Sequence, residues 1–229
     1  LDGFDRAPTS EGGMKIVIVG GVAGGATAGA RIRRLDENAE IVIFERSGYV
    51  SYANCGLPYY IGGVIEHEAA LTLQSPEGFY SRYGIVVKVN HEVTAINPEA
   101  KTVSVVDLKT GKRFEERYDK LLLSPGAKPV LPDFCIEDER VFTLRTVEDT
   151  LKIRDYIETA APRSATVIGG GFIGLETAEN LRAAGLDVTL VQRGAHLLNV
   201  VDGDIAAFVH AAFASEGIRL MLDADTKSM

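Results

Sequence analysis

The chain has 229 residues, with 32 acidic and 24 basic side chains, a formal net charge of −8 and a hydrophobic share of 46%. The acidic balance and the lack of any Lys/Arg run longer than two argue against a nucleic-acid partner, which needs a basic face. No stretch approaches the ~20 apolar residues that span a bilayer. The hydrophobic share is that of a core-forming protein, so we expect one large domain or two small ones.

The first thirteen residues, LDGFDRAPTSEGG, are polar and show no periodicity. They lack the apolar core of a signal peptide, so we treat 1–13 as an added leader or a disordered segment. The two cysteines lie 80 positions apart and do not suggest a disulfide framework. Without an export signal, we expect a cytoplasmic protein.

Two segments repeat the order of strand, glycine turn, helix and strand. The elements expected in the first segment cover 15–19, 24–36 and 41–44. Those expected in the second cover 165–168, 172–184 and 188–191, followed by a helix over 204–216 and a strand over 218–222. The repeat predicts an α/β fold with two Rossmann-like dinucleotide-binding βαβ domains.

The segment between the two repeats has a different pattern. Alternation and turn residues predict a small antiparallel meander over 85–97, 102–108 and 114–118, followed by a buried strand over 120–123. A connecting helix is expected over 146–160. We therefore place the domain boundary near 148, which gives one domain over 14–148 and a second over 149–229.

The glycine turns carry the first chemical signal. A strand that ends in glycines lets the backbone approach a pyrophosphate, which the following helix N-terminus then binds. The second turn has the complete GxGxxG spacing, at Gly169, Gly171 and Gly174. The first turn has glycine only at the outer positions of this motif, Gly20 and Gly25. Val22 stands at the middle position, followed by the small residues Ala23 and Gly24.

The residues that end the second strand of each unit differ in charge. Glu45, 25 positions after Gly20, is expected to accept hydrogen bonds from an adenosine ribose. The second unit has Gln192 and Arg193 there, which removes the repulsion of a 2′-phosphate and adds a donor. This favours NADPH, or use of both NADPH and NADH. A plain surface charge at Arg193 is the alternative.

The segment SYANCGLPYY around Cys55 is the most informative. No CxxC motif is present, so a redox cycle at Cys55 needs an external partner, either a small thiol or oxygen. Ser51 and Asn54 are expected to supply hydrogen bonds near the sulfur. The alternative is a buried structural cysteine, the class to which we assign Cys135.

Five segments together resemble the coenzyme A-disulfide reductase branch of the FAD-dependent pyridine nucleotide-disulfide oxidoreductases, which also includes persulfide reductases. They are VGGVAGGATAGARIRR, IVIFER, SYANCGLPYYIGG, YDKLLLSPGA and IGGGFIGLE. The resemblance covers 14 to about 222. It implies electron transfer from NAD(P)H through FAD to Cys55, which reduces coenzyme A disulfide or related persulfides. A sulfenic-acid NADH oxidase or peroxidase, and a catalytically incomplete flavin-binding fragment, are the alternatives.

The resemblance also implies roles for individual residues, with Cys55 catalytic and Tyr60 where other flavin disulfide reductases carry a second redox cysteine. The residues expected along FAD are Gly20, Val22, Ala23, Gly24, Gly25, Glu45, Arg46, Asn54, Val93, Ser124, Pro125, Gly126 and Arg145. Those expected along NAD(P)H are Gly169, Gly171, Phe172, Ile173, Gly174, Glu176, Gln192 and Arg193. Phe172 stands where a tyrosine often gates the nicotinamide pocket, and Glu176 resembles the acid that positions the nicotinamide.

A substrate site for coenzyme A is expected on the first helix. Thr27, Arg31 and Arg34 have the spacing of one helix face, and the resemblance places them, with Ser51 and Asn54, against coenzyme A. We expect the neighbouring stripe to pack on the sheet; its residues are Ala28, Ile32 and Leu35. Tyr83 stands where some relatives carry a lysine for the same ligand.

Members of the resembled family continue well beyond position 229. We therefore expect both domains to be incomplete here and the full-length form to be a homodimer, in which the partner subunit's last domain supplies active-site tyrosines. The histidines show no metal-ligand spacing, so we expect no metal; they are His67, His91, His196 and His210.

Overall fold

The computed structural model describes residues 13–228, so the leader expected over 1–13 lies almost wholly outside the described residues. The chain forms two compact units. Unit 1 contains residues 13–53 and 72–127, and unit 2 contains residues 54–71 and 128–228. The second unit therefore begins at residue 128 and also includes residues 54–71, whereas the expected boundary lies near 148. The assignment of 14–148 and 149–229 to two cofactors therefore stays a prediction.

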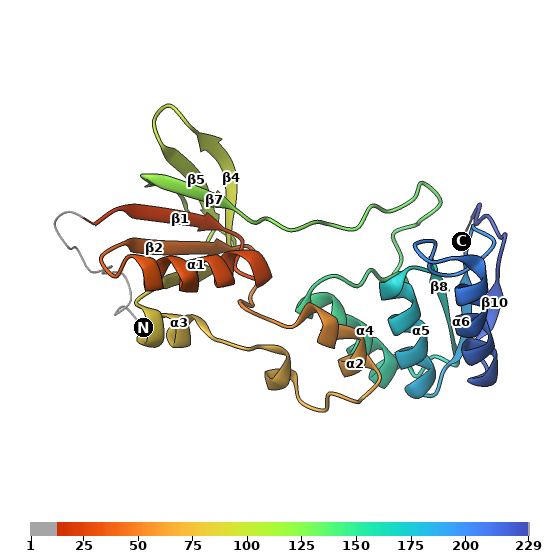
Figure 1. Ribbon diagram of the computed structural model, residues 1–229. Helices are drawn as coiled ribbons and strands as arrows, with labels where there is room; N and C mark the ends of the chain where they lie inside the picture. Colours follow the sequence, from red (N-terminus) through yellow and green to blue (C-terminus); the bar gives the residue numbers. More distant parts are fainter. Residues whose placement is uncertain (1–12, 229) are drawn as a thin grey trace. The chain divides into compact units, whose positions relative to one another are not determined.

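Unit 1 is built on a four-stranded parallel sheet with the strand order β3-β2-β1-β7. Its strands are β1 (Lys15–Val19), β2 (Glu40–Glu45), β3 (Val86–Val89) and β7 (Lys120–Leu123). The helices α1 (Ala23–Leu35) and α3 (Pro76–Tyr83) belong to the same unit, and α1 lies along one face of the sheet (Figure 1). The core on this side joins residues of the sheet, α1 and α3, such as Ile18, Ile43, Ala26 and Phe79.

A three-stranded antiparallel meander covers the other face of this sheet, with β4 (His91–Asn97), β5 (Thr102–Asp107) and β6 (Arg113–Arg117). A second core cluster joins Val17, Val42 and Phe44 of the sheet to Val103 and Val105 of the meander. The expected meander segment 85–97 is corrected here. Its first part forms β3, which pairs in parallel with β2, and the antiparallel strand starts after Asn90, whose φ is +57°.

Two other expectations for unit 1 need correction. The strand over 120–123 has the expected bounds, but it lies at the edge of the sheet, and Leu123 is 56% exposed. On α1, Leu35 is 70% exposed rather than packed on the sheet. The buried face of this helix consists of Gly25, Ala26 and Gly29.

Lys15 joins three strands at one end of unit 1. Its Nζ lies 2.7 Å from Glu40 Oε1 of β2 and 2.6 Å from Glu116 Oε1 of β6. Partial burial lowers the pKa of Lys15, but the hydrogen bonds and charges of Glu116 and Glu40 outweigh it, so the pKa is raised. A raised pKa means that the charged lysine stabilises the fold below its ordinary pKa of 10.5 and that this contribution is lost at higher pH.

We expect the variant Lys15→Met to melt about 2–4 °C below the unmodified chain near neutral pH, because two carboxylates lose their shared cation. The difference in Tm is expected to shrink at a pH above the raised pKa of Lys15, where the side chain itself loses its charge. Thermal melts of both proteins at the two pH values measure it. An equal difference in Tm at both values would show that the charge is not responsible.

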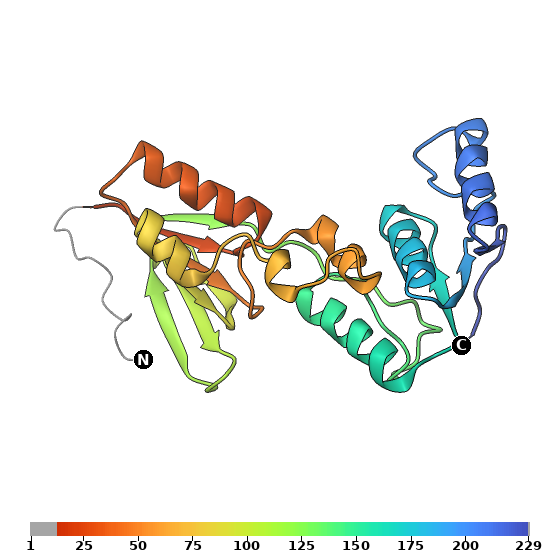
Figure 2. The same ribbon diagram turned by 90° about the horizontal axis from the view of Figure 1, so that it is seen from below.

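Unit 2 contains a three-stranded parallel sheet with the order β10-β9-β8. The strands are β8 (Ser164–Ile168), β9 (Asp187–Val191) and β10 (Arg219–Met221), and the helices are α4 (Val147–Ala160), α5 (Phe172–Ala183) and α6 (Gly203–Ser215). Figure 2 shows α5 and α6 in this unit from below. Their apolar residues share one core with Leu190 and Val188 of β9 and with Ile153 of α4.

A short segment from before β3 also belongs to unit 2. It contains the 3-10 turn η1 (Asn54–Gly56), the helix α2 (Leu57–Ile61) and the 3-10 turn η2 (Glu68–Leu71). Ile61 is part of the core of unit 2, and α2 packs on α4 and α5. The segment that carries Cys55 is thus held by elements about 100 positions further along the chain. Across residues 13–228, no helix is long and apolar enough to cross a membrane.

Candidate active site

The first glycine turn is closed by close backbone contacts within unit 1. Gly20 has a φ of +95°, a value that favours glycine, and a Cβ at this position would overlap the carbonyl oxygen of Ser124. A Cβ at Gly25 would overlap the carbonyl oxygen of Gly20. The outer glycines therefore serve the tight turn and the close approach of α1 to the strands, the roles that the motif assigns to them.

The carboxylate of Glu45 lies buried beside this turn, with the residue 9% exposed. Its Oε2 accepts a 2.7 Å hydrogen bond from the N–H of Gly21, and its Oε1 accepts a 2.8 Å bond from the N–H of Ser47. A carboxylate has about four acceptor positions, so each oxygen keeps capacity for a further donor. Glu45 therefore keeps acceptors that could bind a ribose hydroxyl, and its role at a ribose stays a prediction.

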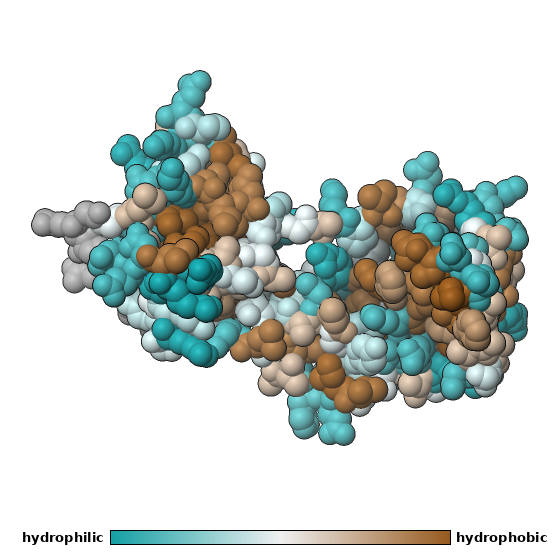
Figure 3. All heavy atoms as spheres, in the orientation of Figure 1, coloured by the Kyte–Doolittle hydropathy of each residue, from teal (hydrophilic) through white to brown (hydrophobic). Residues whose placement is uncertain are grey.

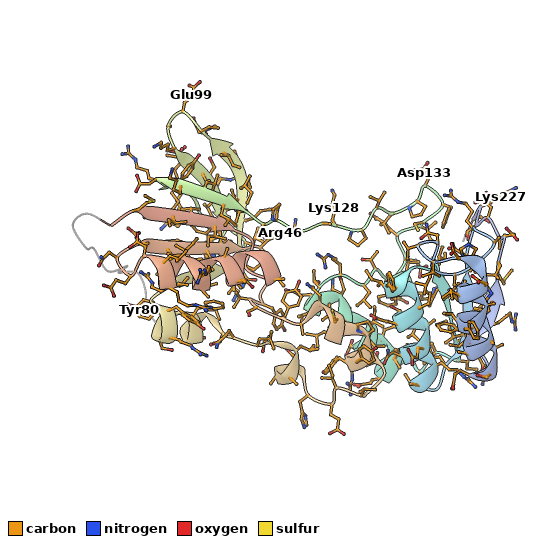
Figure 4. The ribbon with its side chains drawn as sticks, in the orientation of Figure 1. Arg46, Tyr80, Glu99, Lys128, Asp133 and Lys227 are labelled. Carbon is orange, nitrogen blue, oxygen red and sulfur yellow. The ribbon has the colours of Figure 1, made fainter. Side chains whose placement is uncertain are left out.

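Other residues expected along FAD lie around the same unit. Val93 is half-buried at a bulge of β4, where the register with β5 shifts between Val93 and Ala95. The N–H of Ser124 donates to Val19, and Pro125 and Gly126 follow it at the surface. Arg46, labelled in Figure 4, follows β2 and places Nη1 3.5 Å from Glu92 Oε1 of β4.

The second glycine turn repeats the first within unit 2. Gly169 has a φ of +108°, and a Cβ at Gly174 would overlap the carbonyl oxygen of Gly169. Gly171 differs, because a Cβ there would meet no described atom within 4 Å. The middle glycine is thus not required by the packing of residues 13–228. Its backbone is exposed at the start of α5, where a pyrophosphate is expected.

Gln192 is the structural counterpart of Glu45. The last strand pairs, Val19 with Phe44 and Ile168 with Val191, place both residues directly after equivalent positions. Gln192 Oε1 accepts a 3.0 Å hydrogen bond from the N–H of Gly170, as Glu45 does from Gly21. The same backbone contact is therefore made by a neutral side chain, and the exposed Arg193 follows it.

Both helices that follow the glycine turns begin without a side-chain cap from the described residues, at Val22 for α1 and Gly171 for α5. By contrast, Ser75 caps α3 and Thr146 caps α4, although α6 also begins without a side-chain cap, at Asp202. Uncapped N–H groups and the positive end of the helix dipole suit a phosphate. The glycine turns and helix starts therefore fit the dinucleotides that the sequence predicts.

Cys55 lies exposed in η1, and both cysteines of the chain are free. Its neighbour Asn54 accepts a 3.4 Å hydrogen bond from Arg145 Nη1. At the other end of α2, Arg154 lies 4.4 Å over the ring of Tyr60 and donates a 2.9 Å bond to the Tyr60 carbonyl. The exposure of Cys55 contradicts the alternative of a buried structural cysteine. Cys135 is partly buried.

The residues expected to bind coenzyme A share the exposed side of α1, as the spacing predicts; they are Thr27, Arg31 and Arg34. Tyr83, at the end of α3, is half-buried and packs on Phe79, with Arg82 over its ring. Ser51 has a φ of +51° and donates its N–H to the carbonyl of Gly21. Its backbone therefore forms part of the first glycine turn.

The expected nicotinamide residues lie at the start of α5. Phe172 and Ile173 are 62% and 56% exposed, and Glu176 is half-buried. Figure 3 shows hydrophobic side chains gathered over the region of α5 and α6. Of the expected FAD residues, Asn54 and Arg145 belong to unit 2 with Cys55, and the others belong to unit 1. Within residues 13–228, no three His, Cys, Asp or Glu side chains form a candidate metal site.

Several contacts at the site were not predicted from the sequence. The hydrogen bond from Gly21 to Glu45 could have been suspected only from the position of Gly21 in the glycine pair of the first turn. No sequence pattern predicts the contacts of Arg154, His196 and His210, because each side chain binds a backbone group whose position depends on the fold.

Two glycine turns at the carboxyl ends of parallel strands, with an exposed cysteine in a separate turn, define an α/β protein with two dinucleotide-binding folds and a candidate redox thiol. The chain belongs to the pyridine nucleotide-disulphide oxidoreductase family, whose model matches residues 14–229. This confirms the predicted fold class.

Within this family, the chain is similar to particular reductases. The chain is 42% identical over 215 residues to the coenzyme A disulfide reductase of Staphylococcus haemolyticus strain JCSC1435, covering 94% of this chain and 48% of the relative. The structure of reduced CoADR-RHD from Bacillus anthracis superposes with a TM-score of 0.92 at 46% identity, covering 95% of this chain and 39% of that one. An NAD-dependent persulfide reductase from A. fulgidus gives a TM-score of 0.90 at 33% identity, over 94% and 41% of the two chains. The chain thus spans about half the length of the curated relative.

Proposed function

We propose that the protein passes electrons from NAD(P)H through FAD to Cys55, which reduces coenzyme A disulfide or a related persulfide. The main support for this proposal is Cys55, which is exposed and free on η1 in a chain with two dinucleotide-binding folds. The similarity to a coenzyme A disulfide reductase and a persulfide reductase supports the substrate class. We place the reaction in the cytoplasm and propose that the full-length form is a homodimer.

The chemistry at Cys55 is a thiol–disulfide exchange. The Cys55 thiolate attacks one sulfur of coenzyme A disulfide, the substrate S–S bond breaks, and one coenzyme A leaves as a thiolate. A mixed disulfide between Cys55 and the second coenzyme A remains. Two electrons and one proton then release the second coenzyme A as a thiol and restore the Cys55 thiolate. Tyr60 stands five positions beyond Cys55, so a nearby resolving cysteine is absent from the sequence there.

The residues of unit 1 fit FAD. The turn closed by Gly20 and Gly25 leaves the start of α1 open to a pyrophosphate, and Glu45 keeps acceptors for the ribose. When bound, FAD accepts a hydride from NAD(P)H and supplies the two electrons that the mixed disulfide requires. We propose that Thr27, Arg31 and Arg34 hold the coenzyme A phosphates by hydrogen bonds and charge.

The residues of unit 2 favour NADPH, or both nicotinamide cofactors, over NADH alone. Gln192 makes the backbone contact of Glu45 without a negative charge, so a 2′-phosphate meets no repulsion there. Arg193 is exposed and supplies a planar set of donors that suits phosphate. A KM for NADH far below that for NADPH would contradict this preference.

Gly171→Ala tests the NAD(P) site directly. The added methyl group meets no described atom, so we expect an unchanged Tm. The methyl group would lie where the backbone must approach a pyrophosphate, so we expect the Kd for NADP⁺ to rise about tenfold or more. Titration calorimetry and a thermal melt measure the two quantities. An unchanged Kd together with an unchanged Tm would show that no pyrophosphate approaches Gly171.

Oxygen consumption separates the proposed reductase from an oxidase. With NAD(P)H and coenzyme A disulfide under air, the reductase is expected to release two thiols for each NAD(P)H consumed. Uptake of one O2 for every two NADH consumed, without thiol release, would instead show the sulfenic-acid chemistry of a water-forming oxidase, and NADH consumption that requires added H2O2 would show that of a peroxidase.

A further inference from the structure

The backbone N–H and carbonyl of Leu197 each form a hydrogen bond with a histidine side chain. Leu197 is 0% exposed and belongs to the core of unit 2. Its N–H donates a 3.1 Å hydrogen bond to His210 Nε2 of α6, and its carbonyl lies 2.9 Å from His196 Nδ1. Because a carbonyl can only accept, His196 carries its donor proton on Nδ1, and because His210 accepts at Nε2, its own proton lies on Nδ1. Both polar groups of a buried residue are therefore satisfied by side chains.

The same loop also holds the second glycine turn. The N–H of Leu198 donates a 2.8 Å hydrogen bond to the carbonyl of Gly170, and Leu198 itself has a φ of +51°. The N–H of Gly170 donates to Gln192 Oε1 at 3.0 Å. A Cβ at Gly170 would be 2.5 Å from Leu197 Cδ2, so the loop packs directly on the turn. Gly170 is thus fixed on both of its backbone polar groups by residues 192–198.

We propose that His210 is a positioning residue for the adenosine end of the NAD(P) site. It fixes Leu197, and through Leu198 it holds Gly170 and the strand end that carries Gln192 and Arg193. This inference rests on the proposed function, which assigns these residues to NAD(P)H. Without an acceptor on α6, the N–H of Leu197 would be buried and unsatisfied, and the loop would have to shift away from the glycine turn to reach water.

Two variants of the FAD-loaded chain test the role. His210→Leu removes the acceptor, whereas His210→Gln keeps an acceptor oxygen at a similar reach. We expect His210→Leu to raise the Kd for both NADP⁺ and NAD⁺ about fivefold to tenfold in titration calorimetry, and His210→Gln to stay within about twofold. A merely structural role would lower the Tm of His210→Leu and leave the Kd values of the two variants alike.

The tautomer of His210 provides a second test that needs no variant. Nitrogen NMR of the unmodified chain is expected to show the proton on Nδ1 of His210 and an acceptor at Nε2, and a proton on Nε2 would overturn the proposal even if His210→Leu did not fold. Equal Kd values for the unmodified chain and His210→Leu would also overturn it and leave the proposed function intact. An unmodified chain that binds neither NADP⁺ nor NAD⁺ would contradict the proposed function, and the role of His210 with it.

Discussion

Replacing Cys55 with serine is expected to lower the rate of coenzyme A disulfide reduction by about 10³-fold or more, because the alkoxide of serine does not replace a thiolate in disulfide exchange. Cys55 lies exposed in a short turn rather than in a core. We therefore expect Cys55→Ser to keep its Tm and its bound FAD, so that the loss is chemical. The NAD(P)H-dependent rate of thiol release measures it, with the flavin absorbance as a check on loading.

Cys135→Ser is the matched control, because it removes the second cysteine of the chain from a loop between β7 and α4. Its rate is expected to equal that of the unmodified chain. A Cys55→Ser protein that keeps its disulfide reductase activity would exclude Cys55 as the nucleophile. A large loss of rate in Cys135→Ser alone would transfer the role to Cys135.

Gly25→Ala is expected to have the largest effect on stability. The added Cβ would overlap the carbonyl oxygen of Gly20, a backbone atom that cannot move without opening the turn. Overpacking of this kind costs about 3 kcal/mol, so we expect the Tm to fall by about 10 °C and the FAD content to fall with it. Thermal melts and the ratio of flavin to protein absorbance measure both.

Gly171→Ala is the control for this variant as well. It adds the same methyl group to a glycine turn, but into open space at a φ of −84°. The two variants therefore distinguish Gly25, which the packing of the fold requires, from Gly171, which we expect only a bound ligand to require. A Gly25→Ala protein with an unchanged Tm would show that α1 does not approach Gly20 as closely as described.

Most strands and helices, and both glycine turns, could be predicted from the sequence because each depends on local pattern; α2 and α3 were not predicted. The packing of α1 was predicted only in part: Ile32 packs on the core as expected, but Leu35 is exposed. The helix instead buries Gly25, Ala26 and Gly29, and a Cβ at Gly29 would be 3.3 Å from Ile43 Cδ1. Small residues permit a short helix–sheet distance, and a hydropathy pattern does not detect this reason for burial.

The parallel pairing of β3 with β2 was missed for a similar reason. Residues 85–97 alternate as one continuous antiparallel strand would, and the reversal depends on the positive φ of Asn90, a non-glycine residue. The choice of neighbour also depends on α3, which returns the chain to the edge of the parallel sheet. Such pairings are decided by tertiary contacts that local sequence does not encode.

The candidate site was predicted by residue type, but its supporting contacts were not. Cys55, Glu45 and Gln192 were identified by position in a motif. By contrast, Arg154 and His210 act across 94 and 13 positions on backbone groups of Tyr60 and Leu197. Contacts of that kind become visible only when the fold brings the segments together.

The mass of the intact chain after reaction with coenzyme A disulfide shows directly whether Cys55 is the nucleophile that forms the mixed disulfide. The chain, reduced and then treated with coenzyme A disulfide, is analysed without reductant and again after dithiothreitol, and the adduct is mapped by digestion. We expect one coenzyme A adduct on Cys55 that dithiothreitol removes and that Cys55→Ser does not form. A chain without the adduct, or one modified at Cys135 instead, would contradict it.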